Sequence, residues 1–331
     1  MYRNIDEQDI SKYSKIPKIY AHLKDKKFDD WEIPPWELCI DLSKKIGEGT
    51  WANVYLAKWR QTIVVAKVLK NISDLEAKQL IIKEFQYMTK MHHPNIVQLF
   101  GYVEEPFVIV MEYFQNGDLL ENLLKLTLSQ KIKIAKDILQ GLTYIHERKP
   151  HALIHRDIKL RNILLTNSYT AKISDFGLST FSINNIIKSY SGNDLVNLIN
   201  NTNQNKRENL ITCDTKDLTD NVGTKRYMAP EIKTGNYNTK VDIYSCGILF
   251  HELFTNTRYE YFVNIYAPNN LNILILKMIN PNPDLRPTST IAIKEFNNIK
   301  FKKDTIIQQL KSLKLNLING KTKIVIRKVK K

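Results

Sequence analysis

The chain has 331 residues, of which 43% are hydrophobic and 25% are charged, a balance typical of a folded globular protein. This excludes fibrous and disordered architectures, and a length above 300 residues favours two packed lobes or one large α+β domain. The three cysteines, Cys39, Cys213 and Cys246, are too widely spaced to predict a disulfide framework or a metal-binding cysteine pair. A charged N-terminus and the lack of an apolar run of about 18 residues predict an intracellular, cytoplasmic protein without a transmembrane segment.

The positive charge is concentrated at the C-terminal end. Residues 300–331 carry eleven Lys and Arg residues against Asp304 alone, which gives this tail +10 of the total charge of +15. A basic tail can bind phosphates or anionic lipid head groups, although most charge runs are simply solvated. We therefore expect no specific nucleic-acid binding and keep an anionic partner for the tail as an alternative. Asn319-Gly320 is a hairpin-turn signature within it.

The first 115 residues predict a small sheet with one helix. Residues 1–36 are polar and end near WEIPPWEL, a segment with two tryptophans that we expect to pack on a sheet edge. A capping-box signature at Ser73 and Glu76 predicts a helix that begins near Asp74. Strand patterns occupy residues 41–68, 96–103 and 107–114.

The following residues predict a helical lobe after a turn at Asn116-Gly117. Residues 128–146 repeat apolar side chains with a helical period, and residues 241–254 are apolar almost all round, which indicates a buried helix. Residues 179–221 are rich in Asn, Ser and Thr and have little periodicity. Long segments of this kind in a compact domain are usually functional or disordered.

Two glycines and a lysine in the first strands are candidates for phosphate binding. Gly47 and Gly49 lie in IGEGT, where the missing side chains let backbone N–H groups approach an anion, although two such glycines are usually just a turn. Lys67 lies in an apolar strand and needs an anionic partner, because an unpaired buried charge is costly. Glu84 is the best candidate, since it lies on the apolar face of the predicted helix.

Two short loops supply the remaining polar groups. LIHRDIKLRNILL places Asp157, Lys159 and Asn162 between apolar runs. KISDFGLS places Asp175 18 residues after Asp157. Each loop alone is compatible with an ordinary turn. Together they suit phosphoryl transfer, because oxygen ligands hold Mg²⁺, an ammonium balances phosphate charge and a carboxylate positions a hydroxyl.

In combination, these motifs resemble those of a eukaryotic protein kinase. The matches extend from Gly47 to Pro287 and include the glycine loop, the strand lysine, HRDIKLRN, DFG, GTKRYMAPE and NPNPDLRPT. WEIPPWEL and HPNIVQLFGY are similar to the tyrosine-kinase-like group, whose members mostly phosphorylate serine and threonine. The resemblance implies a bilobal, protein-kinase-like α+β fold with a small β-rich N-lobe, which holds one helix, and a larger, mainly helical C-lobe.

The resemblance also sets the expected boundaries. These are an N-terminal extension at 1–36, an N-lobe at 37–115, a C-lobe at 116–299 with a long, Asn-rich activation segment at 175–231, and the basic tail at 300–331.

ATP, Mg²⁺ and protein substrates are the implied partners. The implied catalytic residues are Asp157, Lys159, Lys67 and Glu84, and the implied Mg²⁺ ligands are Asn162 and Asp175. Lys67, aligned by Glu84, would hold the α- and β-phosphates of ATP. Asp157 would accept the proton of a serine or threonine hydroxyl, and Lys159 would stabilise the γ-phosphate. Lys159 and Thr224 match serine/threonine rather than tyrosine kinases.

Further positions are implied to bind the nucleotide or to support the site. The nucleotide-binding residues would be Ile46, Gly47, Gly49, Val54, Val65, Lys67, Met111, Glu112, Phe114 and Leu164. Met111 would control access behind the adenine, and the backbone of residues 112–114 would form its hinge. The supporting contacts would be Asp242 with the N–H groups around His155 and Arg156, an ion pair of Glu231 with Arg286, and a stack of Leu99, Met88, Phe176 and His155.

Several positions depart from the family pattern. Ala52 replaces the third glycine of the loop, and Val65 replaces the usual alanine, which predicts weakened nucleotide affinity through overpacking. Residues 175–231 are unusually long, and residues 255–286 are short, which predicts a reduced substrate-docking helix. Asp220, with phosphorylated Thr219 or Thr215, is hypothesised to pair with Arg156, or else it belongs to a solvated loop.

Three interpretations of function remain open. The first is an active ATP- and Mg²⁺-dependent serine/threonine kinase, which is favoured because inactive relatives usually lack one of Lys67, Asp157 and Asp175. The second is a catalytically weak or inactive kinase-like scaffold. The third is an adaptor that acts through the basic tail, for which truncation of residues 300–331 would abolish a salt-dependent interaction.

Overall fold

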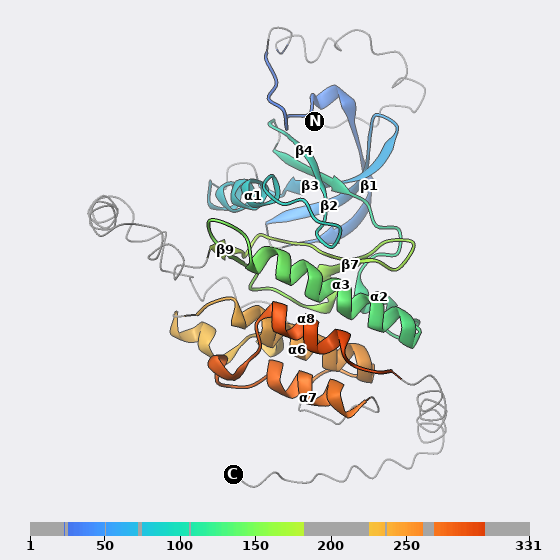
Figure 1. The fold of residues 1–331 in the computed structure, drawn as a ribbon. Helices are drawn as coiled ribbons and strands as arrows, with labels where there is room; N and C mark the ends of the chain where they lie inside the picture. The colour runs from blue at the N-terminus through green and yellow to red at the C-terminus, as the bar shows by residue number, and fades with distance from the viewer. Residues whose placement is uncertain are drawn as a thin grey trace, which may run out of the picture.

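The computed structural model describes most of the chain (Figure 1). The described residues are Leu23 and residues 26–49, 51–71, 75–105, 107–181, 225–235, 237–260 and 268–301. Several predictions lie outside them: the cap residue Ser73, the candidate phosphorylation sites Thr215, Thr219 and Thr224, Asp220, the Asn319-Gly320 turn and the tail from residue 302. Within the described ranges, no helix combines the length and the apolarity needed to cross a bilayer.

The N-terminal lobe is a five-stranded antiparallel sheet with one helix, seen at the top of Figure 1. The strands are β1 (Leu38–Glu48), β2 (Ala52–Trp59), β3 (Thr62–Leu69), β4 (Leu99–Val103) and β5 (Val108–Glu112), in the order β1-β2-β3-β5-β4. Alternation along β3 places Val64 and Ala66 in an apolar cluster on one face of the sheet. Val65 and Lys67 therefore point to the other face, which faces helix α1 (Leu75–Met88).

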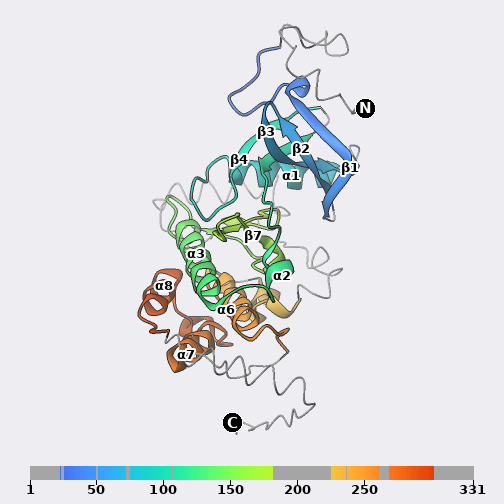
Figure 2. The same cartoon turned by 90° about the vertical axis from the view of Figure 1, so that its right-hand side faces the viewer.

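The C-terminal lobe is mainly helical and lies below the sheet in both views (Figures 1 and 2). Its helices are α2 (Leu119–Asn122), α3 (Leu128–His146), α6 (Lys240–Thr255), α7 (Asn269–Met278) and α8 (Ser289–Asn297). Short strands β6 (Leu153–Ile154), β7 (Ile163–Leu165), β8 (Ala171–Ile173) and β9 (Thr180–Phe181) pair as β6-β9 and β7-β8. The 3₁₀ turns of this lobe are η4 (Leu160–Asn162), η5 (Lys225–Tyr227), η6 (Pro230–Thr234) and η7 (Pro283–Leu285), and a further one, η3 (Pro35–Glu37), precedes β1. The expected bilobal α+β fold is confirmed.

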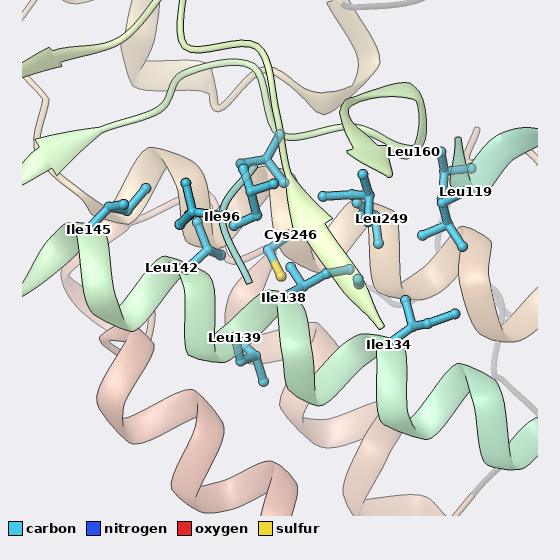
Figure 3. Packing of buried hydrophobic residues seen from close by; sticks show 14 of the residues in the cluster. Ile96, Leu119, Ile134, Ile138, Leu139, Leu142, Ile145, Leu160, Cys246 and Leu249 are labelled. Carbon is cyan, nitrogen blue, oxygen red and sulfur yellow. The ribbon is translucent and has the colours of Figure 1, made fainter. Parts of the chain in front are cut away.

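The two long helices of this lobe form its core. Helix α3 begins at a capping box, in which Gln130 N donates to the Thr127 hydroxyl and the Gln130 side chain accepts from Thr127 N. Helix α6 is buried along nearly its whole length, as its apolar sequence predicts. Figure 3 shows Ile138 and Leu142 of α3 in the same packed layer as Cys246 of α6. This core supports the loops of the candidate site.

The N-terminal segment packs against the edge strand β4, as expected for WEIPPWEL. Ile33 N donates to Tyr102 O at 2.7 Å, and Tyr102 N donates to Trp31 O at 2.9 Å. The Trp31 ring meets Phe85 of α1 edge to face, with 6.4 Å between centroids. A Cβ on Gly101 would lie 2.4 Å from Trp31 O. Glycine is therefore required at this position for the segment to lie so close to β4.

Candidate active site

Lys67 joins the two lobes at the candidate site. Its Nζ lies 2.6 Å from Oε2 of Glu84 on α1 and 3.3 Å from Oδ1 of Asp175 in the other lobe. Glu84 is buried, as its position on the apolar helix face predicted. Burial alone would lower the pKa of Lys67, but the two carboxylates outweigh it and raise the pKa above its usual value. The lysine therefore stays charged, and the predicted pairing of Lys67 with Glu84 is confirmed.

Asp157 is the buried carboxylate of the loop between β6 and β7. Its Oδ2 accepts hydrogen bonds from Lys159 Nζ at 2.6 Å and from Asn162 Nδ2 at 2.8 Å. Its Oδ1 is buried and has no hydrogen-bond partner among the described residues. Burial raises the pKa of Asp157 above its usual value, although Lys159 opposes the shift. An oriented carboxylate with one unused oxygen is suited to accepting a proton.

A two-stranded hairpin brings Asn162 and Asp175 to the same place. Asn162 ends η4 directly before β7, and Asp175 follows β8 by two residues. The strands pair through Ile163 and Ile173, and Ser174 N donates to Asn162 O at 2.9 Å. Asp175 has a left-handed φ of 64°, which costs energy for a residue other than glycine. This conformation, which only the three-dimensional structure reveals, accompanies the contact of Asp175 with Lys67.

Asn162 and Asp175 fit the oxygen ligands of Mg²⁺. The Asn162 amide uses its nitrogen for two hydrogen bonds to Asp157, which leaves its oxygen to act as a ligand. The Asp175 side chain is 47% exposed, so it is open to an ion from solvent. Mg²⁺ commonly takes one or two protein oxygens and completes its octahedron with phosphates and water. Among the described residues no cluster of three or more His, Cys, Asp or Glu side chains could hold a metal.

Asp242 of helix α6 holds the loop that carries Asp157 through hydrogen bonds to its backbone. Its carboxylate accepts from the N–H groups of His155 and Arg156, each at 2.8 Å, as the resemblance implied. It also lies 2.9 Å from His146 Nε2, a partner that the sequence did not indicate. Burial would raise the pKa of Asp242, but the hydrogen bonds and the nearby histidines together lower it below its usual value. Asp242 is therefore a buried anion with a structural role.

The other supporting contacts are also present. Arg286 and Glu231 form a two-pronged ion pair, with distances of 2.5 Å from Nη1 to Oε1 and 2.9 Å from Nη2 to Oε2. The His155 and Phe176 rings meet at 4.8 Å. The remaining members of the expected stack, Leu99 and Met88, are buried in the same apolar cluster as Phe176.

The positions implied in adenine binding lie on β2, β3, β5 and β7 and in the residues directly after β5. Val65 is buried and pairs with Met111 across the β3-β5 ladder. The Glu112 carboxylate has two partners: its Oε1 accepts from Gln98 N at 2.7 Å and lies 2.6 Å from Lys172 Nζ. Phe114 is buried, and Leu164 is half-buried in β7. Lys172 is a contact that sequence reasoning missed, because the β8 position becomes adjacent to β5 only after folding.

The glycine loop presents a less open backbone than its sequence suggested. Gly47 pairs with Val54 across the β1-β2 hairpin, and the Gly49 N–H donates to Ala52 O at 2.8 Å. That amide closes the turn in this conformation, so a phosphate would compete with Ala52 O for it. Ile46 is 49% exposed beside this turn, where it could cover a nucleotide.

Arg156 lies beside Asp157 in a left-handed conformation, with a φ of 68°. Its guanidinium donates to Leu178 O and, at 2.8 Å, to the Tyr237 hydroxyl. The hypothesised partner Asp220 lies outside the described residues. The pairing of Arg156 with Asp220 therefore stays a prediction.

Comparison with known proteins agrees with this geometry. The family described as "Protein kinase domain" matches residues 40–264. Serine/threonine-protein kinase VIK of Arabidopsis thaliana is 35% identical over 68% of this chain and 48% of its own length. Serine/threonine-protein kinase 12 and serine/threonine-protein kinase CTR1, both also of Arabidopsis thaliana, are 30% and 31% identical over 90% and 69% of this chain, and over 65% and 25% of their own lengths. The chain thus spans about half or less of the length of several relatives.

The matched region contains every group assembled above from Lys67 to Asp242. The chain belongs to the eukaryotic protein kinase family.

Proposed function

We propose that the protein is an ATP- and Mg²⁺-dependent protein kinase that transfers the γ-phosphate of ATP to serine and threonine hydroxyls of proteins. The observation that carries the proposal is the contact of Lys67 with both Glu84 and Asp175. One ammonium thereby links the helix of the N-lobe to the candidate metal ligand of the C-lobe. The arrangement is present in the described structure and needs no rearrangement to unite the charged groups.

The residues of this chain divide the chemical work. Lys67, kept charged by its two carboxylates, binds the α- and β-phosphates, and Glu84 fixes its position. Asp157 receives the proton of the substrate hydroxyl at Oδ1, the oxygen with no partner among the described residues. Lys159 balances charge on the transferred phosphoryl group. Asn162 and Asp175 would hold Mg²⁺, which when bound supplies positive charge to the phosphate oxygens.

The preference for serine and threonine rests on Lys159, two residues from Asp157 and 2.6 Å from its carboxylate. This lysine occupies the position that the resemblance associates with serine/threonine kinases. Phosphoamino-acid analysis of a labelled generic substrate tests the preference. Phosphoserine and phosphothreonine are expected, and a predominance of phosphotyrosine would contradict it.

The proposal includes the domain division and cellular location inferred from the sequence. The N-lobe comprises residues 37–115, the C-lobe residues 116–299 and the activation segment residues 175–231, with the protein acting in the cytoplasm. An anionic partner of the basic tail, residues 300–331, is tested by comparing how the full chain and a chain truncated after residue 299 bind to anionic vesicles at low and high salt.

The decisive test of activity compares three purified proteins with labelled ATP, Mg²⁺ and a generic protein substrate. The parent and Asp41→Asn, a change at a half-buried carboxylate on β1 outside the proposed site, should incorporate label equally. Asp157→Asn should lose about 100-fold or more, because it removes the proposed base. Equal labelling by Asp157→Asn and the parent would show that a contaminating kinase is responsible.

The inactive-scaffold alternative rests on Val65, which is buried next to the Met111 position. Calorimetric titration of ATP with Mg²⁺ separates binding from turnover. Binding by the parent without any transfer would support a scaffold. Binding with transfer, together with loss of binding in Lys67→Met, is expected for the kinase.

A further inference from the structure

We propose that the preferred substrates carry acidic side chains close to the hydroxyl that is phosphorylated. This inference rests on the proposed kinase function and adds the charge class of the substrate. It comes from an asymmetry in the C-lobe: the three carboxylates described below are engaged within the protein, whereas three described cations are exposed.

Glu252 of α6 is the most deeply engaged carboxylate of this surface. It is 1% exposed. Its oxygens accept from the Tyr227 hydroxyl and from Tyr259 N at 2.9 Å, and Arg226 Nε lies 3.0 Å away. The carboxylate therefore has no capacity left to bind a basic residue of a substrate.

Glu231 and Asp118 are likewise committed. Both oxygens of Glu231 are bound by the fully buried Arg286. Asp118 caps α2 by accepting from Glu121 N at 2.9 Å, and Arg161 Nη1 lies 3.6 Å from its other oxygen. A basic substrate would have to compete with a helix cap for Asp118 and with a buried arginine for Glu231.

Three cations of the C-lobe, in contrast to these carboxylates, have exposed side chains. The Arg161 side chain is 65% exposed, although it lies within a loose 3.6 Å contact of Asp118. Lys225 and Lys233 are exposed. No described residue forms an ion pair with either lysine. These side chains therefore present positive charge to solvent.

Contacts within the fold link Arg161 and Lys225 to the loop that carries Asp157. Arg161 precedes Asn162, whose amide donates to Asp157 at 2.8 Å. Lys225 lies in η5, which is fixed to α6 because the Ser245 hydroxyl donates to Tyr227 O at 2.7 Å. Ser245 is one helical turn, about 5 Å, from Asp242, which braces the Asp157 loop. Two positively charged positions are therefore connected to the loop of the proposed base.

Opposite charges on a surface of this kind attract with modest strength. An exposed ion pair is expected to improve kcat/KM about 2- to 5-fold per acidic residue, and the gain should shrink at high salt. The effect is a preference among substrates, because the transfer chemistry itself depends on Lys67, Asp157 and Asp175.

The test uses serine peptides that are identical apart from the residues flanking the serine, which are Asp and Glu, Ala, or Lys and Arg. The kcat/KM of the parent is expected to follow acidic above neutral above basic, with the differences reduced at 0.3 M salt. Arg161→Glu and Lys225→Glu should weaken or reverse this order. Lys294→Glu, a change of the same charge at an exposed site on helix α8, should leave the order as in the parent.

The outcomes separate this inference from the proposed function. Equal or faster turnover of the basic peptides by the parent would overturn the substrate preference while leaving the kinase function intact. An unchanged order of preference in both Arg161→Glu and Lys225→Glu would overturn it as well. If no peptide and no generic protein is phosphorylated, the kinase function itself fails. If a charge-reversed variant does not fold, as judged by circular dichroism, Arg161→Gln or Lys225→Gln replaces it. Each of these neutral variants should lower the preference for the acidic peptide.

Discussion

Arg156 and Asp242 are 86 residues apart in the chain, yet Arg156 N donates a 2.8 Å hydrogen bond to Asp242 Oδ1. Arg156 has a φ of 68°, a conformation that costs about 1 to 3 kcal/mol in residues other than glycine. The carboxylate offsets this cost by accepting from two consecutive N–H groups, those of His155 and Arg156. The geometry of the loop that carries Asp157 is therefore set by a buried helix in the core.

Asp242→Asn is expected to disturb this loop more than the rest of the protein. In the parent, N–H groups donate to both oxygens of the Asp242 carboxylate. The asparagine side chain carries no charge, and its NH₂ group would face one of these donors. Charge-assisted hydrogen bonds of about 1.5 to 3 kcal/mol each are therefore lost. We expect kcat to fall at least about 10-fold while ATP affinity, which depends on Lys67, changes little. Steady-state kinetics and calorimetry measure the two quantities.

Ile248→Val provides the control for Asp242→Asn, because it shortens a fully buried side chain on the same helix. It should cost about 0.5 to 1.5 kcal/mol of stability and leave kcat near that of the parent. A kcat for Asp242→Asn as high as that of Ile248→Val would contradict the bracing role.

The buried ion pair of Arg286 with Glu231 should be required for stability. The Arg286 side chain is fully buried and also donates to the carbonyl oxygens of Asn280, Lys240 and Pro281. Glu231→Gln should lower the free energy of unfolding by about 3 to 5 kcal/mol, because it leaves a buried charge without its counter-ion. Chemical denaturation measures the loss. Lys277→Ala, which removes an exposed pair with Glu295, should cost less than about 1 kcal/mol, and similar losses in both variants would refute the distinction.

Gly101→Ala should loosen the N-terminal segment. The added Cβ would lie 2.4 Å from Trp31 O and 3.0 Å from Cγ1 of Ile33. We expect a loss of about 1 to 3 kcal/mol in the free energy of unfolding, typical of overpacking.

A double-mutant cycle identifies the origin of the Gly101→Ala effect. Trp31→Ala weakens the packing of the segment on Phe85, so Gly101→Ala should cost less in that background than in the parent. Strictly additive losses, measured by thermal or denaturant unfolding, would mean that the clash lies elsewhere.

The raised pKa of Asp157 predicts a trade between stability and activity. A carboxyl whose pKa is higher in the folded than in the unfolded state destabilises the fold when it is ionised. This cost is full above the folded-state pKa and disappears as the pH falls toward the unfolded value near 3.8. Asp157→Asn should therefore raise the melting temperature at pH 8 and lose this advantage on acidification. The activity of the parent should fall as the pH drops through the raised pKa, since the base must be ionised.

Melting curves of the parent and Asp157→Asn between pH 5 and pH 8, with activity profiles of the parent, measure both effects. A melting-temperature difference that grows on acidification would have the opposite sign to the one expected for a raised carboxyl pKa.

The sequence predicted the local features of this protein well. The helical period placed one helix at residues 128–146, the bounds that α3 has. Apolar neighbours on a strand and a helix were sufficient to pair Lys67 with Glu84, because a buried cation requires a buried anion. Motif spacing, read with the family resemblance, also indicated the contacts of Asp242 and of Glu231.

Contacts between remote polar groups could not be read in this way. His146 and Asp242, or Lys172 and Glu112, share no spacing that links them, and His146, Lys172 and Glu112 are each compatible with solvent exposure when read alone. The commitment of Glu252 to Tyr227 and Arg226, on which the substrate preference depends, is of the same kind.

The sequence by itself determined which residues are apolar and periodic, and hence the main elements, while its motifs, read with the family resemblance, indicated the fold class and the charged groups of the site. The tertiary structure decided which oxygen of Asp157 is unused, which residues adopt a left-handed backbone and which surface charges stay exposed. The physical reason is that periodicity reports burial along one element, whereas hydrogen-bond satisfaction and electrostatic pairing depend on distances between elements that only packing fixes.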